Sequence, residues 1–72
     1  MLGNVLRNAR EQAGLSQETV AKRARIGRSY LSRLENDVKS PTVKVLLRIC
    51  GAIGVSAGDV LHRVEKLKQN KK

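Results

Sequence analysis

Aromatic side chains are almost absent from this chain. Tyr30 is the only one, yet hydrophobic residues make up 40% of the 72 residues. A core must therefore be built from leucine, valine, isoleucine and alanine, which suits packed helices. A chain of this length has room for one small core, so we expect a single all-α domain over residues 1–72, of modest stability.

Cysteine and histidine are equally scarce. Cys50 has no second cysteine for an internal disulfide, and His62 is the only histidine, so no clustered set of metal ligands exists. Helical spacing places Cys50 beside Leu46 and Ile49, which predicts a buried apolar side chain. Neither a nucleophile–base set nor a glycine-rich phosphate loop is present. The sequence predicts a protein that is not an enzyme and uses no metal and no cofactor.

Long apolar runs are also missing. No stretch approaches the roughly 18 apolar residues that a membrane-spanning helix needs, and the first residues lack a signal-peptide pattern. We therefore expect a cytoplasmic protein without a membrane partner, which would associate with the nucleoid if it binds DNA.

Acidic residues are too few to balance the basic ones, since 15 lysines and arginines face 6 acids and give a formal net charge of +9. A flexible basic tail at about residues 68–72 explains only part of this excess. Between Lys22 and Arg48 there are eight basic residues and two acidic ones. A polyanion is the expected partner, and salt should weaken the complex through counterion release. A solvated basic surface that keeps the protein soluble is the alternative if charge is considered alone.

The segment from Leu15 to Asn36 reads LSQETVAKRARIGRSYLSRLEN and contains two short helical patterns. Ser16 suits the N-cap of a helix over residues 17–24. Residues 25–27 interrupt the pattern, and apolar spacing resumes in a second helix over residues 28–36. Two helices separated by a three-residue break are the arrangement that a DNA-reading helix-turn-helix requires.

The rest of the chain predicts three more helices. Gly14 suits the left-handed stop after the first of them, and Thr42 or Ser40 suits the N-cap of the next. Ser56 followed by Asp59 forms a capping box for the last. We expect these helices at residues 2–13, 42–53 and 57–67.

Four stretches of the chain carry a family resemblance when taken together: LSQE, VAKRA, SYLSRLEN and SPTVKVLLRICGAIGVS. They resemble the helix-turn-helix domains of phage Cro and repressor proteins, and those of the controller proteins of restriction-modification systems. The resemblance covers about residues 6–61. It implies a compact five-helix, lambda-repressor-like domain and a transcriptional regulator that binds double-stranded DNA.

The exposed face of the second helix of the motif carries hydrogen-bond donors and no acid. These residues are Arg28, Ser29, Ser32 and Arg33. A guanidinium offers two parallel donors that match the O6 and N7 acceptors of guanine in the major groove. We therefore expect Arg28 and Arg33 to read bases, although Arg33 could hold a phosphate instead. The two serines can donate to, or accept from, a base or a phosphate.

A second set of residues is expected to contact the DNA backbone. Gln17 opens the first helix of the motif, where free backbone N–H groups and the helix dipole favour an anion. For Gln17 the alternative is a plain helix-start residue, and for Tyr30 it is a ring that covers the edge of the core. The resemblance extends the set to Ser16, Gln17, Tyr30, Asn36, Lys39, Ser40 and Lys44.

Glu35 needs a separate explanation, because an acid that faces DNA would repel it. By resemblance, Glu35 points inward and forms a structural salt bridge with Arg10 of the first helix. The alternative is a surface acid among cations.

Three positions depart from the family's pattern. Arg25 stands where glycine is common in the turn, and Asp37 replaces the glycine that often ends the reading helix. At position 25, in the turn, a non-glycine residue must adopt an unfavourable backbone conformation. Gly27 stands where serine or threonine usually caps the reading helix, and glycine is a weaker cap.

One reading helix contacts few base pairs, so a homodimer on a palindromic operator is the expected working form. Surplus apolar residues suit a dimer contact at Val55, Val60 and Val64, although they could be ordinary core. An antitoxin that represses its own promoter and binds a toxin stays open as an alternative. So does a nucleoid-coating protein that binds without sequence preference. The sequence identifies no contact with RNA polymerase or with a toxin.

Overall fold

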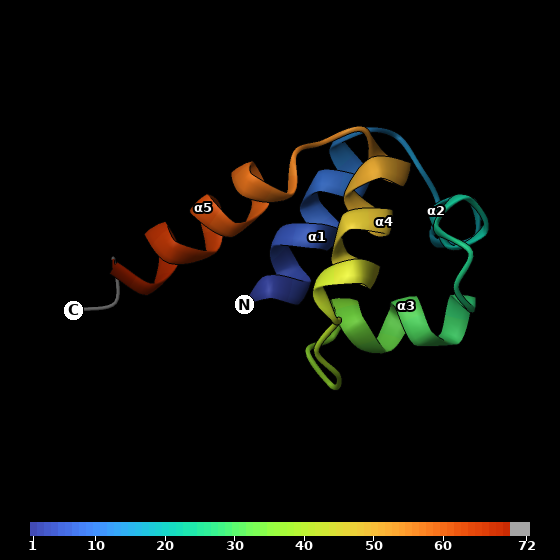
Figure 1. Ribbon diagram of the computed structural model, residues 1–72, viewed down its shortest axis with the longest axis horizontal. Helices are drawn as coiled ribbons and strands as arrows, with labels where there is room; N and C mark the ends of the chain where they lie inside the picture. The colour runs from blue at the N-terminus through green and yellow to red at the C-terminus, as the bar shows by residue number, and fades with distance from the viewer. Residues whose placement is uncertain (70–72) are drawn as a thin grey trace.

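The computed structural model describes residues 1–69, which form five α-helices and no strand (Figure 1). All five expected helices are present, with ends that differ by at most two residues from the predicted ones. The largest difference is at the last helix, which continues past Leu67 to Gln69; the rest of the expected flexible tail lies outside the described residues. The helices are α1 (Leu2–Gln12), α2 (Gln17–Ala24), α3 (Arg28–Glu35), α4 (Val43–Ile53) and α5 (Ala57–Gln69).

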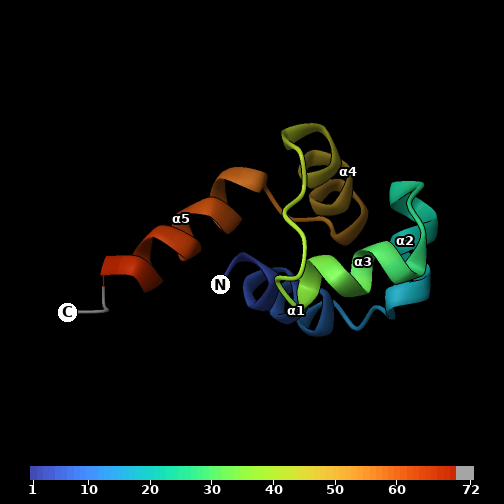
Figure 2. The ribbon, with the colours of Figure 1, turned by 90° about the horizontal axis from the view of Figure 1, so that it is seen from below.

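The helices surround one aliphatic core to which each of them contributes. In Figure 1, α1 and α4 run beside each other, α3 crosses below them, and α5 extends away to one side. Figure 2 looks at the domain from the side of α3 and shows α2 leading into it. Cys50 is buried in this core as expected, and burial raises the pKa of its thiol. The largest fully buried apolar side chains are Leu6, Val20, Leu31, Leu34, Ile49, Cys50 and Val60.

Local capping signals explain where the helices begin. The Ser16 hydroxyl accepts a hydrogen bond from the Thr19 backbone N–H at 3.1 Å, and Thr42 caps α4 in the same way through Val45. Ser56 accepts from the backbone N–H groups of the residues two and three positions further on, so its half of the expected capping box is confirmed. Each bond satisfies a donor that the first turn leaves free.

The backbone strain expected at Arg25 is confirmed, and Asp37 shows the same strain. Arg25 adopts the left-handed conformation (φ 60°, ψ 44°) at the end of α2, and Asp37 adopts φ 58° just after α3. Gly27 is the N-cap of α3 and provides no side-chain hydrogen bond. Both ends of α3 therefore carry residues that cost local stability, so tertiary contacts must hold this helix in place.

The first turn of α1 touches the end of α3 very closely. A Cβ atom added at Gly3 would lie 2.3 Å from the backbone oxygen of Glu35 and 2.6 Å from that of Leu34. The backbone N–H of Gly3 also donates to the Asp37 carboxylate at 2.9 Å. Asp37 thus caps α1, which has no side-chain cap of its own. This contact fixes the angle between α1 and α3.

Within residues 1–69, no single helix combines the length and the apolar composition of a membrane span. Helices α4 and α5 satisfy both requirements only as a pair, and the chain bends by 106° between them.

We predict that Gly3→Ala destabilises the domain by about 1 to 3 kcal/mol, because two backbone oxygens cannot move aside for the added methyl group. Gly51→Ala is the matched control, since a Cβ atom at Gly51 would meet nothing within 4 Å. That control should raise stability by about 0.5 to 1 kcal/mol, the usual gain of alanine over glycine in a helix. Urea unfolding of both variants checks this, and equal effects would contradict the proposed α1–α3 contact.

Candidate nucleic-acid interface

The four predicted base-reading residues lie together on the outer side of α3. Arg28, Ser29 and Arg33 are exposed, and Ser32 is half-buried. With Gln17 they line an open hollow of about 400 Å³, here called the α3 hollow. No acidic side chain is part of its lining. The surface therefore presents guanidinium, hydroxyl and amide donors and no negative charge.

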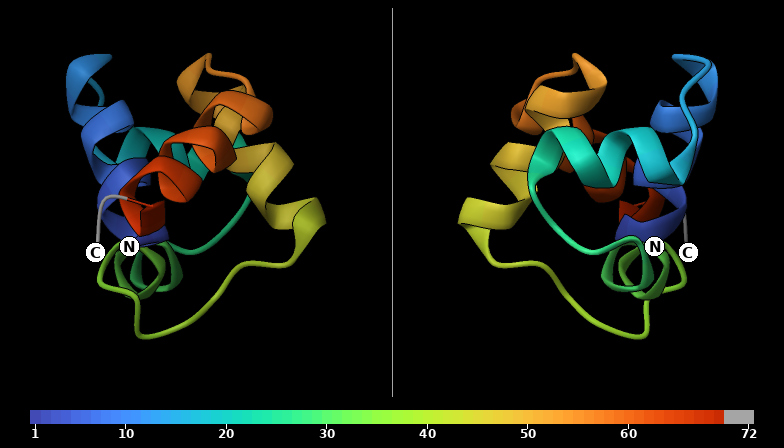
Figure 3. Two further views of the ribbon diagram at one scale, coloured as in Figure 1. Left: turned by 90° about the vertical axis from the view of Figure 1, so that its left-hand side faces the viewer. Right: turned by 90° about the vertical axis from the view of Figure 1, so that its right-hand side faces the viewer.

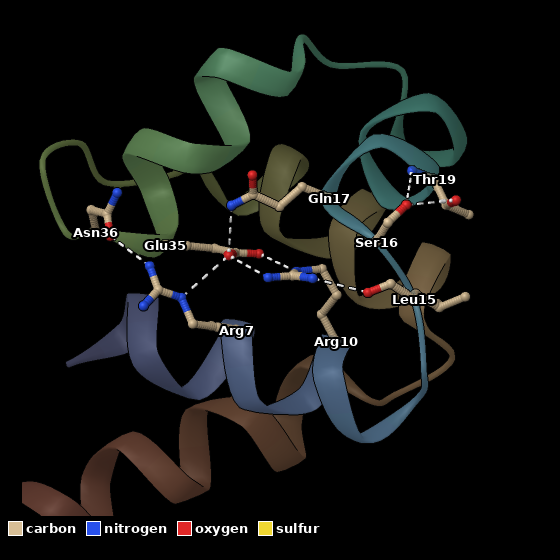
Figure 4. A network of polar contacts seen from close by, with 8 residues as sticks. All are labelled: Arg7, Arg10, Leu15, Ser16, Gln17, Thr19, Glu35 and Asn36. Carbon is tan, nitrogen blue, oxygen red and sulfur yellow. Dashed lines mark hydrogen bonds and ion pairs between the residues drawn. The ribbon is translucent and has the colours of Figure 1, made fainter.

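A buried carboxylate holds α3 in position (Figure 4). The Glu35 side chain is only 1% exposed. Arg10 of α1 donates to it through Nε at 2.7 Å and through Nη2 at 3.0 Å, so the predicted salt bridge between Arg10 and Glu35 is confirmed. The remaining Nη1 of Arg10 donates to the Leu15 carbonyl at 2.9 Å. One guanidinium thus joins α1, the connection to α2 and the end of α3.

Two further residues complete this network, and the sequence did not predict them there. Gln17 donates its amide Nε2 to Glu35 at 3.0 Å, and Arg7 lies 3.5 Å from the same carboxylate oxygen. Arg7 stands three positions before Arg10 on α1, so helical spacing could have indicated it. The contact with Glu35 occupies one donor of Gln17. Its backbone N–H and the second amide hydrogen remain for the predicted phosphate contact.

The electrostatic balance at Glu35 favours the charged form. Burial raises the pKa of this carboxyl, but hydrogen bonds from Arg10 and Gln17 and the charges of Arg10 and Arg7 outweigh it and lower the pKa below the ordinary value of 4.5. The carboxylate therefore stays ionised at neutral pH inside a basic protein.

The predicted DNA-backbone residues lie at the two edges of the α3 surface. Asn36, Lys39, Ser40 and Lys44 are exposed along the connection between α3 and α4 and at the start of α4. Figure 3 shows this connection passing below both helices. Arg7 donates to the side-chain oxygen of Asn36, which leaves the Asn36 amide hydrogens unused by this bond.

The other two members of that set have structural partners as well. Ser16 donates its hydroxyl to Thr19 at 3.0 Å while it caps α2. Tyr30 is half-buried and packs against the core, as in its alternative interpretation.

The residues predicted for a dimer contact differ in burial. Val55 and Val64 are partly buried and pack against the core. Val60 is 1% exposed, so its side chain belongs to the core, as in its alternative interpretation, and not to a dimer interface. The apolar spacing of α5 identified this residue, but spacing does not say whether a buried face meets its own core or a partner.

Comparison with known proteins agrees with this geometry. A family model described as helix-turn-helix matches residues 6–60. The chain belongs to the Cro and repressor-type helix-turn-helix family. Its matched region contains α2, α3 and α4 in full, and the resemblance noted from the sequence is confirmed. The family's members are DNA-binding regulators, so a non-enzymatic role agrees with the family.

Individual relatives cover most of this chain. The transcriptional regulator ImmR of Bacillus subtilis is 35% identical over 69 residues, which is 96% of this chain and 54% of ImmR. The crystal structure of the clp gene regulator ClgR from C. glutamicum is 37% identical, with a TM-score of 0.81, and the match covers 83% of this chain and 78% of that one. The restriction-modification controller protein C.AhdI from Aeromonas hydrophila is 29% identical, with a TM-score of 0.79, covering 82% and 89%. This helix-turn-helix chain spans between 12% and 66% of the length of the curated relatives it matches.

Glu35→Gln should destabilise the domain by roughly 3 kcal/mol at pH 7, because it removes the charge that compensates the partly buried Arg10. The exposed Glu65→Gln is the matched control and should change stability by less than about 0.5 kcal/mol. Urea unfolding at neutral pH measures both changes. Equal small effects would mean that the network does not stabilise the fold.

Acid should act through the same carboxylate. The pKa of Glu35 is lower in the folded than in the unfolded chain, so the unfolded chain takes up the proton first as pH falls. The stabilisation is therefore complete above about pH 4.5 and is lost progressively below it. Unfolding curves between about pH 5 and 2.5 should show a steeper loss for the wild type than for Glu35→Gln. Parallel curves would contradict this assignment.

Proposed function

We propose that the protein is a sequence-specific transcriptional regulator that binds double-stranded DNA as a homodimer on a palindromic operator, with α3 in the major groove. The observation that carries this proposal is the α3 hollow, which is lined by two arginines, two serines and one glutamine and by no acid. Donors of this kind match the acceptors on guanine and on phosphate.

The spacing along α3 suits a reading role. Arg28 and Arg33 are five positions apart, which corresponds to about 7.5 Å along a helix. Two arginines at this separation reach different base pairs, because neighbouring pairs are stacked about 3.4 Å apart. Ser29 and Ser32 lie between them and supply short hydroxyl contacts. In this proposal Arg28, at the start of the helix, reaches deeper into the major groove than Arg33.

The flanking residues fix the register of α3 on the duplex. Lys39, Ser40 and Lys44 follow the end of α3 along the chain, and Gln17 at the start of α2 lines the α3 hollow. Contacts from these positions to sugar and phosphate add affinity without sequence information. Asn36 and Tyr30 join them from α3 itself. The salt dependence of binding comes chiefly from the lysines.

Dimerisation supplies the specificity that one domain lacks. Leu61 and Leu67 of α5 are 46% and 44% exposed, and Val55 and Val64 lie beside them partly buried. We infer that this apolar side of α5, with Leu61 in place of Val60, contacts the second copy. The two copies of α3 would then lie about 34 Å apart, one turn of DNA.

Arg28→Ala should relax the base preference at one position in each half-site and cost about 1 to 3 kcal/mol of binding free energy. Lys39→Ala, which also removes one positive charge, should weaken all sequences equally and reduce the salt slope by about one. Selection of bound sites from random duplexes, followed by titrations of each variant, measures both. If Arg28→Ala selects the same sites as the wild type, α3 does not read that base.

Leu61→Glu should split the dimer, because it places a charge in an apolar contact. Leu47→Glu on α4 is the matched control, since Leu47 is 56% exposed but outside the proposed contact. Light scattering should show a dimer for the control and a monomer for Leu61→Glu. The DNA sites selected by the wild type should be palindromic. A wild type that is monomeric both free and on DNA would refute the homodimer.

A further inference from the structure

A second hollow lies between the end of α2 and the exposed side of α4. These two helices pack beside each other (Figure 3). The volume of the hollow is about 640 Å³, within the range of roughly 300 to 1,000 Å³ that small-molecule sites occupy. We name it the α2–α4 groove. Its lining contains no acidic residue and includes Arg23, Arg25, Lys44, Arg48, Gly51 and Ala52.

Two of its cations have structural partners. Arg48 donates to the carbonyl of Ala24 through Nε and to that of Arg25 through Nη2, both at 3.0 Å. Arg23 donates to the Ala52 carbonyl at 3.3 Å. These bonds satisfy carbonyls at the ends of α2 and α4 and tie the two helices together, so neither arginine requires a ligand to explain its presence.

The other two cations have no such explanation. Arg25 and Lys44 are exposed, and within residues 1–69 their side chains form no hydrogen bond and no ion pair. Arg25 also occupies a left-handed backbone position, φ 60°, where glycine would be less strained. The charges of Arg25 and Lys44 therefore remain available to an anion in the groove.

Gly51 gives independent support. It lies inside α4, where alanine is the better helix former, and a Cβ atom there would meet nothing within 4 Å. Packing therefore does not require glycine at this position. Its missing side chain leaves the surface of α4 open to a ligand. Two locally unfavourable residues, Arg25 and Gly51, thus line the same cationic groove.

We propose that the α2–α4 groove binds a small anion that carries a chain of phosphates. Lys44 and Arg48 lie one helical turn apart, about 6 Å, and Arg25 faces them from the end of α2. A chain of phosphates carries charged oxygens along its length, so it suits cations spread over one helical turn better than a single monovalent anion does. Arg25 and Lys44 supply the unpaired charge, and Gly51 lets the anion lie against α4. This site goes beyond the proposed function, since of these residues only Lys44 belongs to the predicted DNA contacts.

The test is a titration of the ¹⁵N-labelled protein with tripolyphosphate and, separately, with ATP, followed by NMR at low salt. The amide signals of Arg25, Gly51 and Ala52 should shift most. Tripolyphosphate binding at least as tight as that of ATP identifies free polyphosphate as the source, and tighter binding of ATP identifies a nucleotide. Both results support the site.

Two variants test the residues without risk to the fold. Arg25→Gly suits the left-handed backbone, and Gly51→Ala suits the helix, so both should keep or raise the melting temperature. Each should weaken tripolyphosphate binding at least fivefold. Lys22→Gln removes one charge from α2 outside the groove and should change the affinity for tripolyphosphate less than twofold. An equal loss in Lys22→Gln, or shifts that gather on α3, would overturn the proposal.

Operator titrations of the same variants separate this proposal from the proposed function. Arg25→Gly should keep operator affinity within twofold while it loses tripolyphosphate. If it loses operator affinity and tripolyphosphate shifts no signal, the groove belongs to the DNA surface and the anion site is refuted, while DNA binding stands. Larger shifts with a hexaglutamate peptide than with tripolyphosphate would also refute it, in favour of an acidic protein partner.

Discussion

The ionised side chain of Glu35 is enclosed among α1, α2 and α3, and its hydrogen bonds hold these three helices together. It accepts from Arg10 and Gln17 and lies near Arg7, so three positive or polar groups from two helices meet at the last residue of α3. A charge buried without such partners would be expelled. The carboxylate therefore constrains the angle of α3, and because it is enclosed it places no negative charge on the outer surface of that helix.

The two ends of α3 contribute little to the stability of this helix. Its N-cap is Gly27, which gives no side-chain bond, and left-handed non-glycine residues stand before and after it. One of them, Asp37, is used structurally, because it caps α1 from a position 34 residues away. Helix α3 is thus held largely by long-range contacts, and its outer face carries polar residues.

Much of this could be predicted from the sequence. Ser16, Thr42 and Ser56 act through the backbone next to them, so local patterns placed the helix ends to within two residues. The pairing of Arg10 with Glu35 came from family resemblance, since no local rule connects positions 25 residues apart. The Asp37 cap, the Gln17 contact and the burial of Val60 could not be predicted, because each depends on how helices meet in space. The α2–α4 groove was missed for the same reason.

We propose that the donors on the outside of α3 lie against guanines in the major groove. Dimethyl sulfate protection on a selected operator tests it most directly, since this reagent methylates guanine N7 in the major groove and adenine N3 in the minor groove. Guanines should be protected in each half-site, and the centres of the two half-sites should lie about one turn of DNA apart. Protection confined to adenines of the minor groove, with every guanine N7 still reactive, would contradict it.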